Sequence, residues 1–350
     1  MIGRLATAAQ AGLLIMQTHC MNLSEATELV EAAFRKVSVP VESARSVASA
    51  LVAAEAEGQV GHGFSRVEDY VAQVVSGKVV ADASVSVAHA ATTSLLIDAG
   101  NGFAYPALDA AIQAGAELAQ EHGSATMAIY RSHHCGALSV QVEKLAQKGL
   151  VAMMVANAPA AMAPWGAKSA VFGTNPIAFA APRDNKPPLV IDLSLSRVAR
   201  GKVMNAKKAG SSIPEGWALD QDGKPTTDPE AALEGTMVPI GEAKGTALAL
   251  MVEILAALMT GAARSAEASS FFSADGPPPN VGQYLIALKP SDNVGFASRL
   301  EDLLQHIESL DGARLPGQRR LAAMAKAREQ GIDVPVRYIE AIRNIIDGQF

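Results

Sequence analysis

The chain has 350 residues, of which 49% are hydrophobic and 18% are charged, and its formal net charge is −6 at pH 7. A chain of this length and composition can bury a large core in two or three packed subdomains. The negative net charge argues against a nucleic acid or an anionic membrane surface as a partner, because both attract clustered lysine and arginine.

The start of the sequence and the two cysteines indicate where the protein works. The run Ala11–Met16 is too short to cross a membrane, and no small-residue cleavage pattern follows it, so we expect residues 1–20 to be an extension before Met21. Cys20 and Cys135 are too few for a disulfide framework and fit no zinc spacing. We therefore expect a cytoplasmic protein without a metal site.

The pattern of residues 22–58 predicts a helical hairpin. Ser24 is a candidate N-cap for the first helix, and Pro40 and Gly58 are typical of the start and the end of a second, alanine-rich helix. The apolar face of the first helix consists of Leu29, Val30, Ala33, Phe34 and Val37.

The middle of the chain alternates short β-branched runs with helical stretches, which is typical of an α/β protein with a mixed or parallel sheet. The predicted strands are Ser94–Asp98, Thr126–Tyr130, Val151–Ala156 and Leu189–Leu193, and the predicted helices are Pro106–Glu121 and Ser139–Lys148.

The last third of the chain begins with a polar stretch, roughly residues 207–234, which we interpret as an ordered surface loop in which Trp217 needs a packing partner. The segment Gly245–Ala263 is strongly apolar and predicts a helix that is buried on most faces. A strand at Gln283–Lys289 and helices from Val294 onward are expected to follow.

One segment imitates a dinucleotide fingerprint. Gly100 and Gly102 follow the strand Ser94–Asp98, but Tyr105 occupies the place of the third glycine. A Rossmann loop needs that glycine for close packing of helix on strand, and no acidic residue ends a clear second strand about twenty residues later. We therefore do not expect a Rossmann fold.

The segment GQVGHGFSRV contains the first candidate for chemistry. One helical turn would bring His62 and Arg66 to the same face, where the imidazole could exchange a proton and the guanidinium could bind a substrate carboxylate. A capped loop with an incidental surface histidine is the alternative for this segment.

A second candidate follows the predicted strand Thr126–Tyr130. In RSHHCGAL, neighbouring side chains of an extended segment point to opposite faces, so His133, His134 and Cys135 cannot all bind one metal. The carboxyl end of a strand suits ligand binding, and the N-terminus of the next helix is available to an anion. Histidines bonded to backbone carbonyls, and a buried thiol, are the structural alternatives. No G-x-S-x-G elbow or P-loop exists.

Six segments carry a more specific pattern. In chain order they are GHGFSRV (Gly61–Val67), APWGAKSAVFGTNPIAFAAPR (Ala163–Arg183), PLVIDLSLSRVARGKV (Pro188–Val203), IPEGWALDQDGKPTTDP (Ile213–Pro229), AKGTALALMVEIL (Ala243–Leu255) and LPGQRR (Leu315–Arg320). In order and spacing they resemble the malate/L-lactate dehydrogenase superfamily, which is distinct from the Rossmann dehydrogenases. Within it, RSHHCGAL and NGFAYPAL (Asn101–Leu108) look most like the reductases of Δ1-piperideine-2-carboxylate and Δ1-pyrroline-2-carboxylate.

The resemblance implies an α/β fold with a large mixed sheet of the sulfolactate/malate dehydrogenase type, and a homodimer that shapes the active site. We expect a helical N-terminal subdomain with the start of the main domain (21–100), an NAD(P)-binding α/β domain (101–265), and a C-terminal strand and helices that pack back on the N-terminal part (266–350).

The resemblance also assigns roles to residues of this chain. His62 and Asp192 would be catalytic, and Arg66 and His134 would bind the substrate. NADPH, or NADH, would contact a larger set: His133, His134, Cys135, Gly136, Ala137, Thr174, Asp192, Leu193, Ser194, Lys244, Gly245, Gly317, Gln318 and Arg319.

Two positions depart from the family pattern. Gly61 stands where many relatives place a serine that is hydrogen-bonded to the catalytic histidine, and Glu242–Ala243 stands where glycine with histidine or tryptophan is common. A serine–histidine–aspartate relay therefore cannot operate here.

The expected reaction is the NAD(P)H-dependent reduction of a cyclic imine carboxylate to L-proline or L-pipecolate. His62 would deliver a proton to the imine nitrogen while hydride reaches C2, and Arg66 would hold the carboxylate. The alternatives are a 2-hydroxyacid dehydrogenase of the malate or lactate type, which reduces a 2-oxo acid, and a binding protein that keeps the fold without activity.

Overall fold

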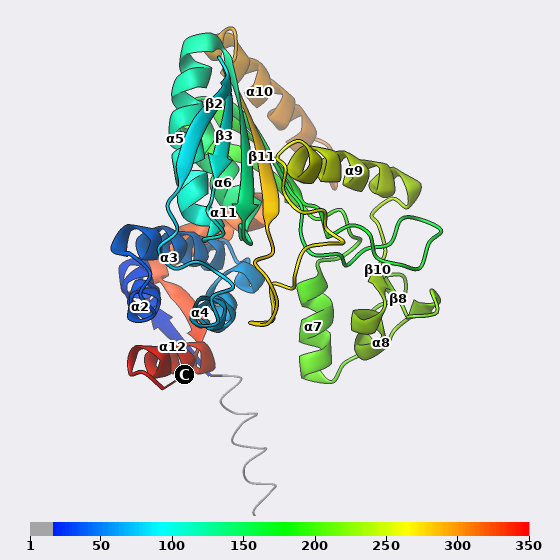
Figure 1. Ribbon diagram of the computed structural model, residues 1–350. Helices are drawn as coiled ribbons and strands as arrows, with labels where there is room; N and C mark the ends of the chain where they lie inside the picture. The colour runs from blue at the N-terminus through cyan, green and yellow to red at the C-terminus, as the bar shows by residue number, and fades with distance from the viewer. Residues whose placement is uncertain (1–16, 350) are drawn as a thin grey trace, which may run out of the picture.

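The computed structural model describes residues 17–349, whose centre is a seven-stranded sheet of order β2-β3-β4-β11-β5-β6-β7 (Figure 1). Within the described residues, β3 and β4 are the only parallel neighbours in this sheet. The predicted mixed sheet is confirmed, and a Rossmann fold is excluded because it needs parallel strands. The strands are β2 (Ser86–Ala91), β3 (Ser94–Asp98), β4 (Ser124–Ser132), β5 (Val151–Ala156), β6 (Ile177–Arg183), β7 (Lys186–Leu193) and β11 (Val281–Leu288).

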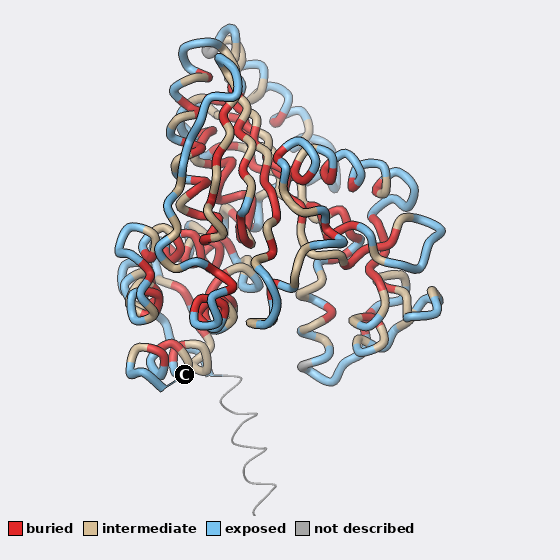
Figure 2. The backbone as a smooth tube through the Cα atoms, viewed as in Figure 1, coloured by how far each residue is buried: buried red, intermediate tan, exposed pale blue. Residues whose placement is uncertain are grey.

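The sheet is covered on both faces, as the buried strands in Figure 2 show. Met154 and Leu285 share a buried cluster with α5 (Ala104–His122) and α6 (Leu138–Gln147). Their chain neighbours Val155 and Tyr284 pack instead in the cluster of α9 (Ala243–Glu253) and the π-helical turn η3 (Ile254–Leu258). This alternation is the period-two pattern of a strand buried on both sides.

A helical layer lies at one end of the sheet and joins distant parts of the chain (Figure 1). It contains α2 (Leu23–Lys36), α3 (Val41–Ala56), α4 (Val67–Val75) and α12 (Val336–Ile346), and Ile339, Ile342 and Ile345 share its core with Phe34. β1 (Thr18–Met21) pairs antiparallel with β12 (Ile332–Pro335), so the boundary expected at residue 20 lies inside a strand. Residues 1–16 of the expected extension lie outside the described residues.

The predicted cap of α2 is wrong. Asn22 Oδ1 accepts a hydrogen bond from the Glu25 amide at 2.9 Å, and the Glu25 carboxylate accepts one from the Asn22 amide at 3.2 Å. This reciprocal pair is a capping box, which satisfies two of the free amides at the helix start. Ser24 lies inside the helix and donates to the Glu28 side chain.

The polar stretch of residues 207–234 is also not a loop. It begins at the end of α7 (Arg200–Ala209) and includes β8 (Ala218–Leu219), β9 (Pro225–Thr226) and α8 (Pro229–Glu234). With β10 (Thr236–Met237), the two strands form a small sheet of order β10-β8-β9. Trp217 packs against the core cluster that includes Ile213, as its size requires.

The apolar segment Gly245–Ala263 is helical over α9 and η3, but the prediction of burial on most faces is wrong for a single chain. Leu250 and Leu258 are 50% and 58% exposed. Four more apolar side chains of this segment are exposed: Leu248, Met251, Ile254 and Met259. We call these six residues the α9 face. The remaining helices are α10 (Asn293–Glu308) and α11 (Gln318–Gln330), and no helix of residues 17–349 is long and apolar enough to span a bilayer.

Candidate active site

His62 and Arg66 lie on two consecutive 3-10 turns, η1 (Val60–His62) and η2 (Phe64–Arg66), rather than on one turn of α-helix. Gly63 separates the turns, and a Cβ there would lie 2.0 Å from Glu55 Oε2, so the turn needs a glycine at this position. Arg66 Nε donates to the Gly61 carbonyl at 2.7 Å, which folds the arginine back over the first turn. His62 and Arg66 therefore lie close together as predicted, but two 3-10 turns bring them together instead of one α-helical turn.

The His62 ring is set against a second histidine. Its centroid lies 5.3 Å from that of His134, and the two rings are stacked at 21°. Burial, with a smaller contribution from the Arg66 charge, lowers the pKa of His62 to about 4, so the imidazole is neutral at neutral pH. Its Nδ1 atom is buried without a hydrogen-bond partner. A Cβ at Gly61 would meet no atom within 4 Å, so sterics do not forbid a serine beside this ring.

Each histidine of the His133–His134 pair has its own side-chain partner. His134 Nδ1 lies 2.5 Å from the Tyr70 hydroxyl, and His133 Nε2 lies 2.6 Å from Gln73 Oε1. Both partners belong to α4, so neither histidine is bonded to a backbone carbonyl through its ring. Among residues 17–349, no three histidine, cysteine or acidic side chains are arranged to hold a metal ion.

A loop with two phenylalanines, Ser270–Asp275, forms one wall of this site; we call it the aromatic loop. The Phe271 ring centroid lies 4.9 Å from that of His134, and the Arg66 guanidinium carbon lies 4.4 Å from the centroid of Phe272. The buried Lys78 ammonium holds the loop by donating to three of its carbonyls at 2.7 to 2.9 Å. Arg66 Nη1 is buried and has no hydrogen-bond partner, although the Asp69 carboxylate lies 4.0 Å away as its ion-pair partner. A substrate carboxylate could therefore accept hydrogen bonds from Nη1 that Asp69 does not.

Asp192 lies at the carboxyl end of β7, where its Oδ2 accepts the Ser139 amide at 2.8 Å. The first turn of α6 therefore binds a carboxylate of the protein, and the expectation that this helix start is open to another anion is wrong. Burial raises the pKa of Asp192, and the Glu57 charge adds to the effect. Burial also raises the pKa of Cys135 to about 12, so its thiol is not a nucleophilic thiolate.

The residues predicted to bind the cofactor gather along the end of β7. The Leu195 amide donates to the Thr174 carbonyl and the Ile240 amide donates to the Leu195 carbonyl, each at 2.8 Å. Gly245 packs so closely on Ile240 that a Cβ would lie 1.9 Å from its carbonyl oxygen. These contacts bring Thr174, Ser194 and the Lys244–Gly245 turn together, while His133 to Ala137 lead into α6 beside Asp192.

Gly317 comes from far along the chain to the same strand. A Cβ on it would lie 2.8 Å from the Val190 carbonyl, and Gly317 caps α11 with a φ of 80°. A cavity of about 120 Å³ opens beside it, lined by Arg183, Gln318 and Arg320 among others. Arg320 Nε is buried without a partner. This one unpartnered donor and the start of α11 would suit a polar group of a dinucleotide, although Arg320 is already paired with Glu57 and Glu143.

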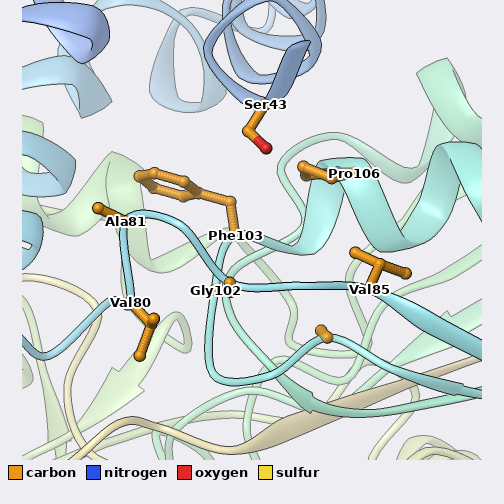
Figure 3. A pocket seen from close by; sticks show the side chains of 9 residues that line it. Ser43, Val80, Ala81, Val85, Gly102, Phe103 and Pro106 are labelled. Atoms are coloured by element: carbon orange, nitrogen blue, oxygen red, sulfur yellow. The ribbon is translucent and has the colours of Figure 1, made fainter. Parts of the chain in front are cut away.

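The imitation fingerprint at Gly100 and Gly102 does not form such a site. Figure 3 shows the cavity beside it, which has a volume of about 10 Å³ and is lined by Gly102, Phe103 and Pro106 among others. That volume holds one water molecule and no pyrophosphate. None of the residues predicted for the active site lines it.

Sequence reasoning missed several residues of the site. Tyr70 lies in α4, four residues after Arg66, which caps that helix, and this spacing could have predicted its position. The pair Phe271–Phe272 in a polar segment was a weaker signal. Glu55 and Lys78 gave none, because buried charged side chains are recognised only by their contacts.

Comparison with known proteins identifies the family of this chain. The family model of malate/L-lactate dehydrogenase matches residues 21–343. The (2R)-3-sulfolactate dehydrogenase (NADP(+)) of Chromohalobacter salexigens is 49% identical over 324 residues, covering 92% of this chain and 97% of that protein. A Δ1-pyrroline-2-carboxylate/Δ1-piperideine-2-carboxylate reductase of Pseudomonas putida is 38% identical over 330 residues, covering 92% and 96%.

A solved structure has the same fold. The Δ1-piperideine-2-carboxylate reductase of Pseudomonas syringae superposes with a TM-score of 0.89 at 36% identity, covering 94% of this chain and all of that one. The predicted resemblance is thus confirmed at the level of sequence and of structure. The chain belongs to the malate/L-lactate dehydrogenase family and is an oxidoreductase.

Proposed function

We propose that the protein is an NADP(H)-dependent dehydrogenase that acts at C2 of a small carboxylate, with 3-sulfolactate and its 2-oxo acid as the first candidate pair. The observation that carries the proposal is the Arg66 Nη1 donor beside the neutral, stacked His62: it has no hydrogen-bond partner, and its ion-pair partner Asp69 lies 4.0 Å away. The choice of sulfolactate is supported by the 49% identity to the Chromohalobacter enzyme.

A cyclic imine carboxylate is the second candidate, and it remains the reading that RSHHCGAL and NGFAYPAL favour. The aromatic loop supports it, because the exposed Phe272 offers an apolar ring against which a five- or six-membered ring can pack. Relatives that act on Δ1-pyrroline-2-carboxylate or Δ1-piperideine-2-carboxylate are 34 to 39% identical to this chain.

In the proposed mechanism, Arg66 binds the substrate carboxylate in the plane of its guanidinium, since Phe272 covers one face of that group. Neutral His62 accepts the proton of the C2 hydroxyl in the oxidative direction, and returns it to oxygen or to an imine nitrogen in the reductive one. The nicotinamide supplies hydride transfer at C2 when the cofactor is bound. Asp192 is the second candidate catalytic residue, after His62.

The chain would hold the cofactor along the end of β7. Thr174, Ser194 and the Lys244–Gly245 turn lie together there, and the cavity beside Gly317 and Gln318 would suit a polar group of the cofactor. The preference for NADP over NAD is taken from the name of the Chromohalobacter relative.

We further propose a cytoplasmic homodimer. The free thiols of Cys20 and Cys135 suit a reducing compartment. The α9 face exposes apolar side chains next to each other, and a helix that is apolar all round is normally covered on all sides. A second copy of the chain is the occupant we propose for it.

The proposal is tested with the purified chain and four substrates: 3-sulfopyruvate, Δ1-pyrroline-2-carboxylate, Δ1-piperideine-2-carboxylate and oxaloacetate, each with NADPH and with NADH. We expect the highest kcat/KM for 3-sulfopyruvate with NADPH. A higher kcat/KM for a cyclic imine would replace the first candidate by the second, and no turnover of any 2-oxo or imino acid would contradict both.

A further inference from the structure

Three polar side chains outside the assigned catalytic groups form a closed set of hydrogen bonds at the meeting point of α3, η1 and α6. Ser139 Oγ donates to Glu57 Oε2 at 2.5 Å. Gln59 Nε2 donates to the same carboxylate oxygen at 2.9 Å and to Ser139 Oγ at 2.8 Å. We call Glu57, Gln59 and Ser139 the polar triangle; Glu57 and Ser139 are buried.

The polar triangle touches both assigned catalytic residues. The Gln59 carbonyl accepts the His62 amide at 2.8 Å, which fixes the start of the turn that carries the imidazole. The Ser139 amide donates to Asp192 Oδ2, also at 2.8 Å. Within the described residues, no hydrogen bond joins the side chains of His62 and Asp192. The two residues are connected instead through the polar triangle.

Arg320 anchors the polar triangle from the opposite side. Its Nη1 lies 2.7 Å from Glu57 Oε1 and 2.8 Å from Glu143 Oε2, and all three side chains are buried. Removing one partner from a buried ion pair is costly, because the other charge stays unpaired. The arrangement therefore holds the Glu57 carboxylate in one orientation, with one oxygen toward Arg320 and the other toward Ser139 and Gln59.

We infer that Glu57 and Ser139 are positioning residues that hold Asp192 in register with the His62 turn. The inference rests on the proposed function, which makes His62 and Asp192 the catalytic pair. If the cluster only stabilised the fold, the Arg320–Glu143 ion pair would suffice, and that pair does not need Ser139. The contacts of Ser139 instead run from Glu57 to Asp192, toward the site.

Because Glu57 is charged and close to Asp192, its positioning role can be detected in the pH dependence of the activity. The titratable groups that face Asp192 are Glu57, which caps the end of α3, and the Cys135 thiol from the loop before α6. Arg320 of α11 reaches Asp192 only through Glu57. Glu57 raises the pKa of Asp192 by repulsion. Neutralising Glu57 therefore lowers that pKa and moves the acidic limb of the pH profile to lower pH.

The test uses Glu57→Gln and Ser139→Ala, with Asp98→Asn as the matched control. Asp98 is also a partly buried carboxylate paired with an arginine, Arg131, but it lies outside the site. We expect kcat to fall about 10- to 100-fold in both variants, the loss typical of misplaced catalytic groups, with KM for the carboxylate substrate changed less than about twofold. In Glu57→Gln the acidic limb should also move to lower pH. A kcat within about twofold of the control, or an unmoved limb in Glu57→Gln, overturns the inference.

A readout that does not depend on activity separates this inference from the proposed function. The His62 amide is the hydrogen-exchange probe, because its acceptor is the Gln59 carbonyl. It should exchange faster in Glu57→Gln and in Ser139→Ala than in the wild type and in Asp98→Asn. If the wild-type chain turned over no substrate, the proposed function would fail and the exchange rates alone would decide: unchanged rates overturn the positioning role, and faster rates support it.

Discussion

At the scale of single residues, the charge state of His62 depends on what Arg66 binds. Burial, and to a smaller extent the Arg66 guanidinium, which is paired with Asp69 at 4.0 Å, favour the neutral imidazole. A substrate carboxylate on Arg66 would offset the positive charge and raise the pKa of His62, so proton uptake by this ring is linked to substrate binding. In the proposed mechanism, the same two residues would thus serve substrate binding and proton transfer together.

His62→Ala removes the proposed proton carrier. We expect kcat to fall by about two orders of magnitude or more, as is usual for loss of a general acid or base. His89→Ala is the matched control, because His89 lies on the exposed strand β2. Steady-state kinetics at saturating cofactor measures the effect, and an unchanged kcat would remove His62 from the mechanism.

Arg66→Met separates anchoring from electrostatics. The variant loses the carboxylate ligand, so KM should rise by about tenfold or more, equivalent to one charge-assisted hydrogen bond. Because the Arg66 charge lowers the pKa of His62, its removal should also raise that pKa, which NMR titration of the His62 ring measures. Equal KM values for the variant and the wild type would argue against the anchor.

Glu55, which accepts a hydrogen bond from the residue two positions after His62, should make the stability of the fold depend on pH. Burial raises its pKa from 4.5 to about 7, while its carboxylate accepts the Phe64 amide. The folded state therefore holds a proton between pH 4.5 and pH 7 that the unfolded state releases, and stability from this group is present below that window and lost as the pH rises through it.

Glu55→Gln should abolish this dependence, because the amide cannot ionise and its oxygen can still accept the Phe64 amide. The measured quantity is the free energy of unfolding in urea of the variant minus that of the wild type. This difference should be up to about 3 kcal/mol larger at pH 8 than at pH 4.5. Taking the difference between the two proteins cancels the opposite titration of His62. An equal difference at both pH values would contradict the raised pKa.

At the scale of elements, the aromatic loop depends on one buried cation. The Lys78 ammonium bonds the carbonyls of Ser270, Ser273 and Asp275, and Gln73 donates to the Phe271 carbonyl. These donors come from α4 and the turn after it, so the loop is held against the helix that also carries Tyr70. Residues 67–78 thereby organise two walls of the site.

Lys78→Met should free the aromatic loop. Three carbonyls lose a charged donor, so we expect a loss of about 2 to 4 kcal/mol in unfolding free energy together with a rise in KM. Lys289→Met is the control, because the Lys289 ammonium also donates to a carbonyl but is exposed. Urea unfolding and substrate titration measure both effects, and a variant that keeps the wild-type KM would show that the loop does not shape the site.

The sequence predicted elements better than it predicted contacts between them. The strands Ser94–Asp98 and Val151–Ala156 have the predicted bounds, because their apolar runs are short and sharply ended. The short strands β8 and β9 lacked such a pattern. Ser139 and Asp192 are 53 positions apart, and Lys78 lies 192 positions from Ser270, so no local spacing could have paired them. The residue pattern of GQVGHGFSRV and the family resemblance both indicated His62 and Arg66, but neither indicated Tyr70, Glu55 or the polar triangle.

At the scale of the whole molecule, the α9 face should hold two copies together. Introducing two charges by Leu250→Glu with Leu258→Glu places carboxylates among apolar side chains, and burying them unpaired costs several kcal/mol. We expect light scattering to give the mass of one chain for this variant and of two for the wild type. Leu303→Glu, on the exposed surface of α10, is the control. A double variant that stays dimeric would place the interface elsewhere.

The pairing of β1 with β12 has a consequence for biosynthesis. The apolar sides of α2 and α3 leave the ribosome about 300 residues before Ile339, Ile342 and Ile345, which complete their core. Until then the nascent hairpin exposes surface that a chaperone can bind. Sheet formation can proceed during translation, but closure of the helical layer must wait for the end of translation. The His62 turn after α3 is therefore expected to gain its rigid support last.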